Sequence, residues 1–273
     1  MKSKLVCSLL AVLLSASAQG QTYVVGVENQ AFTPHYSIDK QGNYQGFARE
    51  VLDLFAAKSG VQLEYRALPV ARLLPALLQG EVDLKYPDSP TWSQPQKAGK
   101  GLVYSQGVVN YVDGTLVAPK NQGQGLEKLQ RLAMVNGWTP WGYQERIEAK
   151  QIQLVPSTDL RQMIKQALKK DVDGVYFNVV VAAHYLDNIR ARPGALVFDP
   201  KLPHTRSTFT LSTLKHPELI QRFDRFLVEQ RAEIAALKTK HQVEANLDSE
   251  FMGMEQWKVE FLKRQKEKGA AGL

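Results

Sequence analysis

The chain has 273 residues, a formal net charge of +7 and a hydrophobic content of 44%. This length suits one large domain or two small ones. Apart from a short run near the C-terminus, the basic residues are interspersed with acidic ones rather than clustered with aromatics on one face. A nucleic-acid partner is therefore not expected.

The N-terminus has the pattern of a secretory signal peptide. Lys2 and Lys4 precede the apolar run Leu5–Leu14, which ends in the small-residue stretch "SASA". The run is shorter than the ~20 residues that a spanning helix needs. We expect residues 1–18 to be removed and the protein to be exported to the periplasm. The only cysteine, Cys7, lies in this segment, so we expect no lipoprotein anchor, disulfide or thiol nucleophile after cleavage.

The following segment alternates short strands with amphipathic helices. Residues 22–28 ("TYVVGVE") form a β-rich run, and a hairpin-like stretch follows. Apolar residues then recur at helical spacing within residues 46–60, where a glycine ends the helix. A strand at 61–68, a helix at 71–80 and a strand at 81–86 come next. This β-α-β-α-β order predicts a mostly parallel sheet covered by helices.

A second α/β unit follows without a long linker. Strands are expected at 131–137, 171–178, 195–199 and 207–213, and helices at 157–170, 179–188 and 217–237. Thr139 and Pro140 read as the N-cap and first residue of a further helix. A final amphipathic helix with apolar residues Phe251, Met254, Trp257, Phe261 and Leu262 is expected to pack on the body. Two such units predict a cleft between them, where strand C-termini and helix N-termini meet a ligand.

The order of several motifs resembles one family over nearly the whole chain. "VGVENQAFTPHYSIDKQGNYQGFAREVLDLFAAKSGVQLEYRALP" has the family's order of strand, acidic residue, aromatic, proline, "G…GF…E" and first helix. "LLPALLQGEVDL", "LVYSQGVV" and "LKKDVDGVYFNVVVAAHYL" follow in matching places. This set resembles the family 3 extracellular solute-binding proteins, the periplasmic receptors that serve ABC importers of amino acids and related solutes.

The resemblance implies the type II periplasmic binding protein fold, an α/β fold of two lobes, each a mixed, mostly parallel sheet flanked by helices. Lobe 1 would comprise residues 19–113 and 203–273, and lobe 2 residues 114–202. Two hinge crossings would fall near "VVNYVDG" and "DPKLPHTRS". Ligand capture would occur by closure of the lobes about this hinge.

The resemblance also implies where a ligand would bind. The matching positions are Glu28, Phe32, Tyr86, Asp88, Trp92, Trp138, Thr139 and Asn178. Two departures from the family argue against a standard amino-acid site. Only Lys97 and Lys100 stand near the place of the arginine that grips the ligand carboxylate, and lysine lacks the bidentate fork. Asn178 replaces the aspartate that holds the ligand ammonium.

Aromatic rings beside carboxylates favour an amine-bearing or a flat aromatic solute. Among the other aromatics, Trp141 is balanced between the cleft and packing in the core or at the lobe edge, and Tyr143 and Tyr176 favour such packing. The carboxylate of Asp88 suits either the ligand or its own loop backbone. Glu28 suits either the ligand or a neighbouring cation, and Arg206 suits a hinge brace or a ligand anion.

Enzyme motifs are absent from the sequence. The 5 histidines show no metal-ligand spacing, and there is no G-x-S-x-G elbow, P-loop or G-x-G-x-x-G. We expect no catalytic residue, metal or cofactor, and a monomer that serves an ABC permease or a receptor. The alternatives are a free amino-acid receptor, a sensory ligand-binding protein, or a dehydratase-like enzyme that uses Glu28 or Asp88 as an acid.

Overall fold

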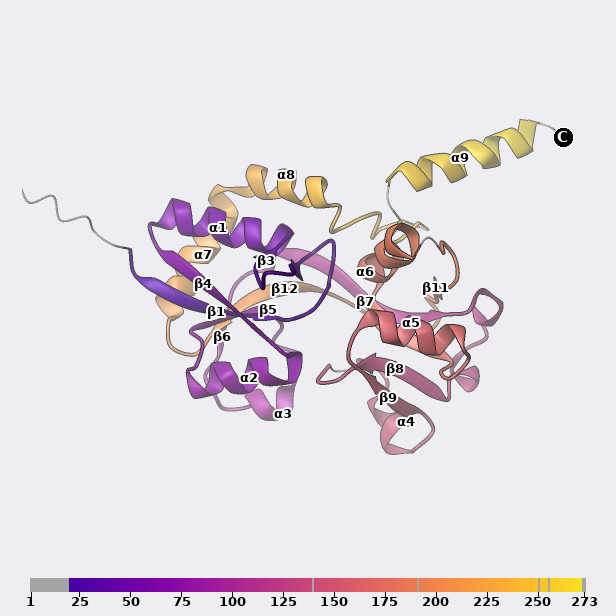
Figure 1. Ribbon diagram of the computed structural model, residues 1–273, viewed down its shortest axis with the longest axis horizontal. Coiled ribbons are helices and arrows are strands. Elements are labelled where there is room, and N and C mark those ends of the chain that lie inside the picture. The colour runs from indigo at the N-terminus through magenta and orange to yellow at the C-terminus, as the bar shows by residue number, and fades with distance from the viewer. Residues whose placement is uncertain (1–19, 139, 191, 250, 255, 272–273) are drawn as a thin grey trace, which may run out of the picture.

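A computed structural model describes residues 20–271 apart from 139, 191, 250 and 255. The expected signal peptide, residues 1–18, and Thr139 lie outside the described residues. The described chain forms two α/β lobes side by side (Figure 1). No helix within the described ranges is long and apolar enough to cross a membrane.

Lobe 1 has helices on both faces of its sheet. Its strands are β1 (Thr22–Glu28), β4 (Gln62–Leu68), β5 (Leu84–Asp88) and β6 (Val103–Tyr104), with a hairpin of β2 (Ser37–Ile38) and β3 (Tyr44–Gln45). Its helices are α1 (Phe47–Ser59), α2 (Val70–Gln79), α3 (Gln94–Lys97), α7 (Pro217–Glu229) and α8 (Arg231–His241). Figure 1 shows α1, α7 and α8 on one face and α2 and α3 on the other.

Lobe 2 repeats this layered arrangement. Its strands are β7 (Val109–Val117), β8 (Arg131–Val135), β9 (Gln153–Ser157), β10 (Gly174–Asn178) and β11 (Val197–Phe198). Its helical segments are the short turns Pro119–Asn121 and Leu126–Lys128, then α4 (Gln144–Glu148), α5 (Leu160–Leu168), α6 (Val179–His184) and the π-helical turn Tyr185–Ile189. Strand β12 (Thr205–Thr213) returns the chain to lobe 1, and α9 (Gln256–Ala271) ends the described chain.

Helix α1 follows from its sequence pattern. Phe47, Val51 and Phe55 recur at helical spacing and are fully buried. Gly60 ends the helix with a left-handed φ of 66°. The Phe55 ring meets Phe223 of α7 edge-to-face at 5.0 Å. Burying a side chain of this size contributes about 1.5–3 kcal/mol, so this face fixes α1 on the sheet.

One continuous path of strands runs through both lobes, in the order β4-β1-β5-β12-β7-β10-β8-β9. Strand β1 pairs in parallel with β4 and β5, and β8 pairs in parallel with β9 and β10. The carboxyl ends of β1 and β5 therefore meet at one edge of the lobe 1 sheet.

Strands β7 and β12 connect the two lobes. Residues Thr205–Phe209 of β12 pair antiparallel with Val109–Asp113 of β7. The rest of β12 pairs with β5 and β6 of lobe 1, with a register irregularity between Thr210 and Ser212. These two antiparallel strands lie near the two predicted hinge crossings, so a rotation of the lobes would bend them.

Three helix predictions were wrong at their ends. The helix expected at 217–237 is two helices, because Gln230 has a φ of −103° and a ψ of 25° that turn the chain between them. Helix α4 begins at Gln144, not at Pro140, since Gly142 has a φ of +80°. The final helix begins at Gln256.

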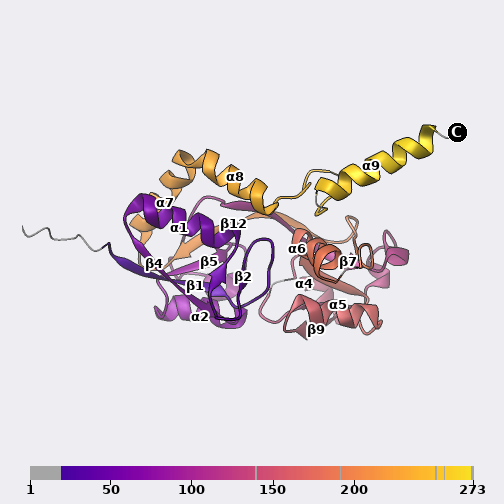
Figure 2. The ribbon, with the colours of Figure 1, turned by 45° about the horizontal axis from the view of Figure 1, so that its top comes forward.

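The last helix packs less on the body than its pattern predicts. Trp257 is 56% exposed and Phe261 49% exposed. Val259 is buried, and Lys258 contacts lobe 2, its Nζ lying 2.6 Å from a carboxylate oxygen of Asp187. Figures 1 and 2 both show α9 pointing away from lobe 2.

Candidate ligand-binding cleft

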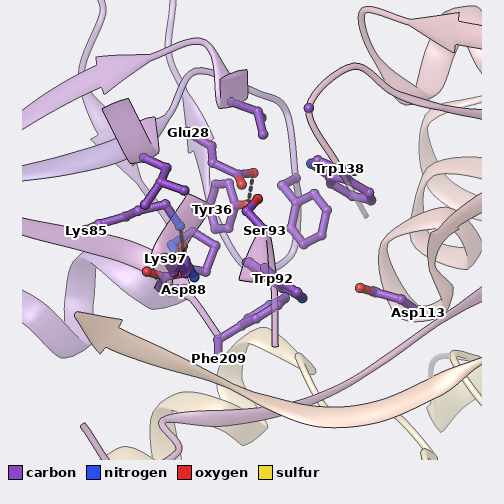
Figure 3. Close-up of a pocket in the computed structure, with 15 residues that line it drawn as sticks. Glu28, Tyr36, Lys85, Asp88, Trp92, Ser93, Lys97, Asp113, Trp138 and Phe209 are labelled. Atoms are coloured by element: carbon purple, nitrogen blue, oxygen red, sulfur yellow. Dashed lines mark hydrogen bonds and ion pairs between the residues drawn. The ribbon is translucent and has the colours of Figure 1, made fainter. Parts of the chain in front are cut away.

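A cleft lies where the carboxyl ends of β1 and β5 face lobe 2. It encloses about 640 Å³, its open mouth included. The residues that line it are Glu28, Phe32, Tyr36, Val70, Leu74, Lys85, Pro87, Asp88, Trp92, Ser93, Lys97, Asp113, Gly137, Trp138 and Phe209. Figure 3 shows lysines on one side, Asp113 on the opposite side, and Trp92 and Phe209 between them.

Two lysines share one buried carboxylate on the lobe 1 side. Asp88 Oδ1 lies 2.6 Å from Lys97 Nζ and 3.0 Å from Lys85 Nζ, and its Oδ2 accepts a 2.7 Å hydrogen bond from Ser212. Burial raises the pKa of Asp88, but the two ammonium groups outweigh it and hold the pKa below its ordinary value. The cluster therefore carries one net positive charge.

Each ammonium of this cluster retains a donor for a ligand. Lys97 Nζ also donates to the Ser89 carbonyl at 2.7 Å, and Lys85 Nζ donates to the Pro87 carbonyl at 2.7 Å. A lysine has three N–H donors, and these contacts with Asp88 and the carbonyls use two on each. Because both residues line the cleft, the remaining donors suit an anionic ligand group.

Glu28 and Asp113 are the other two carboxyl groups of the cleft. Glu28 accepts a 2.5 Å hydrogen bond from the Tyr36 hydroxyl, and burial raises its pKa. The pKa of Asp113 is raised to about 7, chiefly by burial; the Asn178 amide acts to lower it, and the charge of Glu28 acts to raise it. Among the described residues, neither forms an ion pair, and Asp113 Oδ1 has no hydrogen-bond partner. Both carboxyl groups would be stabilised by a ligand cation.

Asp113 lies directly across the sheet from Asn178. The two are paired in the antiparallel ladder of β7 and β10. Asn178 is fully buried and caps α6, its Oδ1 accepting a 3.0 Å hydrogen bond from the Val181 amide. The carboxylate missing at Asn178 is thus supplied to the cleft by the neighbouring strand.

Aromatic rings from both lobes form the cleft wall. Phe32 of lobe 1 lies 5.8 Å from Trp138 and 5.3 Å from Phe177 of lobe 2, between ring centroids. Trp138 stacks on Phe177 at 4.8 Å, and Trp92 meets Phe209 of β12 at 5.8 Å. These contacts across the lobes indicate a closed arrangement.

Gly137 of lobe 2 lies against the start of α2 in lobe 1. Its φ is +90°, and a Cβ built on it would lie 3.1 Å from the backbone N and Cα of Ala71, at the start of α2. A glycine is required here for both its conformation and its lack of side chain.

The structure brings Glu28, Phe32, Asp88, Trp92 and Trp138 together in the cleft, as expected from the sequence. Tyr86 and Asn178 do not line it. Tyr86 is buried in the core, whereas Lys85, Pro87 and Asp88 of the same strand line the cleft. Thr139 lies outside the described residues.

The remaining candidates lie away from the cleft. Tyr143 and Tyr176 are core residues, and the Tyr143 hydroxyl hydrogen-bonds Thr115 at 2.6 Å. Trp141 is 43% exposed and does not line the cleft. Arg206 Nη1 donates to Asp248 at 2.8 Å, which matches a bracing role.

Sequence reasoning missed Tyr36, Lys85 and Asp113. The sequence could have indicated the last two, because each is a charged residue within a run that is typical of a buried strand, where a charge is rare without a specific role. The described part of the chain contains no group of three or more His, Cys, Asp or Glu side chains that could hold a metal.

The lobes, hinge strands and cleft define a type II periplasmic binding protein. The sequence model for bacterial extracellular solute-binding proteins, family 3, matches residues 23–243, and the chain belongs to this family.

Several known proteins are similar to this chain. A probable histidine-binding protein of Neisseria gonorrhoeae is 24% identical over 182 residues, which are 65% of this chain and just under two thirds (66%) of that protein. An ancestral arginine-binding protein bound to arginine superposes with a TM-score of 0.67 at 17% identity, covering 82% of this chain and 99% of that one. An ancestral amino acid-binding precursor of cyclohexadienyl dehydratase gives 0.64 at 20% identity, covering 81% and 95%.

Proposed function

We propose that this protein captures a small amine-bearing solute in the periplasm by closure of its lobes and presents it to an ABC permease. The observation that carries the proposal is the pair of carboxyl groups, Glu28 and Asp113, that line an aromatic cleft without forming an ion pair among the described residues. A ligand ammonium would supply the missing charge. Attraction to Trp92 or Trp138 would add about 0.5–2 kcal/mol per ring.

The lysine cluster extends this proposal to solutes with a carboxylate. The free donors of Lys85 and Lys97 lie on the side of the cleft opposite Asp113 (Figure 3). A zwitterionic solute would place its anion at the lysines and its amine near Asp113 and Glu28. Relatives named for histidine and arginine support an amino-acid-like solute with an amine. A protein that captures its solute by the same closure could also present it to a sensory receptor instead of a permease.

A thermal-shift screen tests the proposed solute class. We expect L-arginine, L-lysine or L-histidine to stabilise the protein, and at 100 times the Kd the gain is about 2.7 kcal/mol. For a chain of this size, that corresponds to a rise in Tm of roughly 5–10 °C. Amines without a carboxylate should stabilise it less, and aromatic acids without an amine not at all. Stabilisation by the aromatic acids alone would contradict the proposal.

Lys97→Met provides a matched pair with Lys100→Met for this screen. Lys97 lines the cleft, whereas Lys100 is exposed outside it. The first change should weaken binding of carboxylate-bearing solutes by about 100-fold, since a hydrogen-bonded charge partner is lost. The second should leave binding by calorimetry unchanged. Equal effects of both changes on affinity would show that the lysine cluster does not contact the solute.

A dehydratase is the second candidate, favoured by the raised pKa of Asp113 and Glu28, because a general acid must hold a proton near neutral pH. Asp88 is excluded from this role, since two lysines hold it ionised. Loss of prephenate absorbance on incubation with the protein, abolished by Glu28→Gln, would support the enzyme over the receptor.

Gly137→Ala should impair closure while leaving each lobe folded. The added methyl group would meet the Ala71 backbone at 3.1 Å. Together with strain at positive φ, this should weaken solute binding about tenfold in calorimetry. Gly125→Ala is the control, because Gly125 has a φ of +80° but no atom within 4 Å of the place a methyl group would take. Equal affinities of the two variants would show that the Gly137 contact does not limit closure.

A further inference from the structure

The chain after α8 forms a third link between the lobes. We call residues 243–249 and 251–254, with the first turn of α9, the C-terminal strap. All but its first residue lie beyond residues 23–243, the part that matches the family. Figures 1 and 2 show the chain passing from α8 on lobe 1 to α6 on lobe 2. Figure 1 shows it on the side of the hinge strands away from α2, which lines the cleft.

The strap first attaches to hinge strand β7. Glu244 Oε1 accepts hydrogen bonds from the Asn110 amide at 2.7 Å and from Asn110 Nδ2 at 2.9 Å. The same oxygen lies 2.9 Å from Nζ of Lys238 in α8. One carboxylate therefore joins lobe 1 to the start of β7.

The strap next attaches to hinge strand β12. Arg206 Nη1 donates to Asp248 Oδ1 at 2.8 Å, and Nη2 donates to the Leu247 carbonyl. The Leu247 side chain is buried against Val112 of β7 and Val179 and Val180 of α6. Polar and apolar contacts thus hold the same short segment against both hinge strands and lobe 2.

The end of the strap is fixed to lobe 2. The Gly253 amide donates to the Ala245 carbonyl at 2.9 Å, and a Cβ on Gly253 would lie 3.0 Å from the Val179 carbonyl. Lys258 Nζ lies 2.6 Å from Asp187, a largely buried carboxylate. Beyond this ion pair, α9 extends away from the body.

We infer that the C-terminal strap holds the lobes in the closed arrangement, so that closed molecules are populated before any solute binds. Both of its ends are attached, one to α8 and the other to α6 and the turn after it. A rotation of the lobes changes the distance between these helices, and it must break the Glu244, Asp248 or Leu247 contacts. Contacts present in only one arrangement favour that arrangement. A larger closed fraction raises the apparent affinity for any solute that needs closure.

Distance measurements between spin labels test this inference in solute-free protein. Labels at Gln79→Cys in lobe 1 and Glu148→Cys in lobe 2 occupy exposed positions, and Cys7→Ser removes the only native cysteine. Replacing Glu244 and Asp248 with alanine removes both strap carboxylates from the hinge strands. We expect the ratio of open to closed molecules to rise about tenfold, since hydrogen bonds to charged groups are among the stronger ones.

Arg131→Ala is the matched control, because its ion pair with Asp173 at 3.2 Å lies within lobe 2. It should leave the distance distribution unchanged. The single variant Asp248→Ala is a second test that should fold normally, because the Asp248 side chain is 95% exposed. Its distance distribution should shift toward the open arrangement by less than that of the double variant. Superimposable distributions for the double variant and the parent would overturn the inference. No solute is present, so the outcome is independent of the proposed ligand.

Discussion

Replacing Asp88 with asparagine is expected to lower the free energy of unfolding by about 3–5 kcal/mol at pH 7, because the change leaves two buried ammonium groups without a counter-charge. Asp88 is fully buried, and Lys85 and Lys97 are nearly so. Solvent compensates little for the lost carboxylate, since all three side chains are buried in the cleft wall. The change should also disorder the lysine donors and so weaken binding of a carboxylate-bearing solute.

Urea denaturation of the solute-free protein measures this loss. Asp53→Asn is the control, because its ion pair with Arg49 is partly exposed and should contribute less than about 1 kcal/mol. Adding Lys85→Met and Lys97→Met to Asp88→Asn should recover much of the stability, since the unpaired charges are then gone. A loss no larger than that of Asp53→Asn would mean that the cluster is well solvated.

The same cluster predicts a pH dependence. The pKa of Asp88 is lowered in the folded protein, so its contribution to stability is complete above the unfolded pKa of about 3.9. The contribution is lost as pH falls through the lower, folded pKa. Asp88→Asn should therefore cost less stability at pH 3 than at pH 7.

Much of the fold could be predicted from local pattern. The spacing of Phe47, Val51 and Phe55, followed by Gly60, predicts α1 closely, because helix periodicity and capping act over a few residues. The predicted helix ends were wrong where the backbone conformation of one residue interrupts or delays the helix, as at Gln230 and Gly142. Apolar spacing carries no information about such a break.

The site was predictable by position but not by chemistry. The motif order placed Glu28, Phe32 and Trp92 at the ends of strands that meet, and all three line the cleft, while their contact with a ligand stays a prediction. The burial of Asp88 was not predictable, because β12, a distant part of the chain, pairs with β5 there and its Ser212 donates to the carboxylate. Asp113 escaped notice for the same reason. Its place beside Asn178 follows from the register of two strands, which no single segment specifies.

Asp113→Asn is expected to stabilise the solute-free protein at pH 8 while weakening solute binding. The folded pKa of Asp113 is raised to about 7, above the unfolded value of about 3.9. Between these values the folded protein holds a proton that the unfolded chain has released, so this group lowers stability as pH rises through that window. Asparagine stays neutral, and the variant should gain about 2–4 kcal/mol at pH 8 and little at pH 4.

Urea denaturation at pH 4, 6 and 8 gives the stability of each variant, and calorimetry gives its affinity. Affinity for an amine-bearing solute should fall about 100-fold, because the ammonium loses a buried charge partner. Asp171→Asn is the control, since its exposed carboxylate lies outside both the cleft and the strap and should show neither effect. In the parent protein, a bound ammonium would favour ionised Asp113, so binding at pH 7 should release a proton. If the heat of binding does not vary with the ionisation enthalpy of the buffer, no proton is released and Asp113 does not contact the ligand amine. If Asp113→Asn is no more stable than the parent at pH 8, the carboxyl group of Asp113 is solvated in the folded protein.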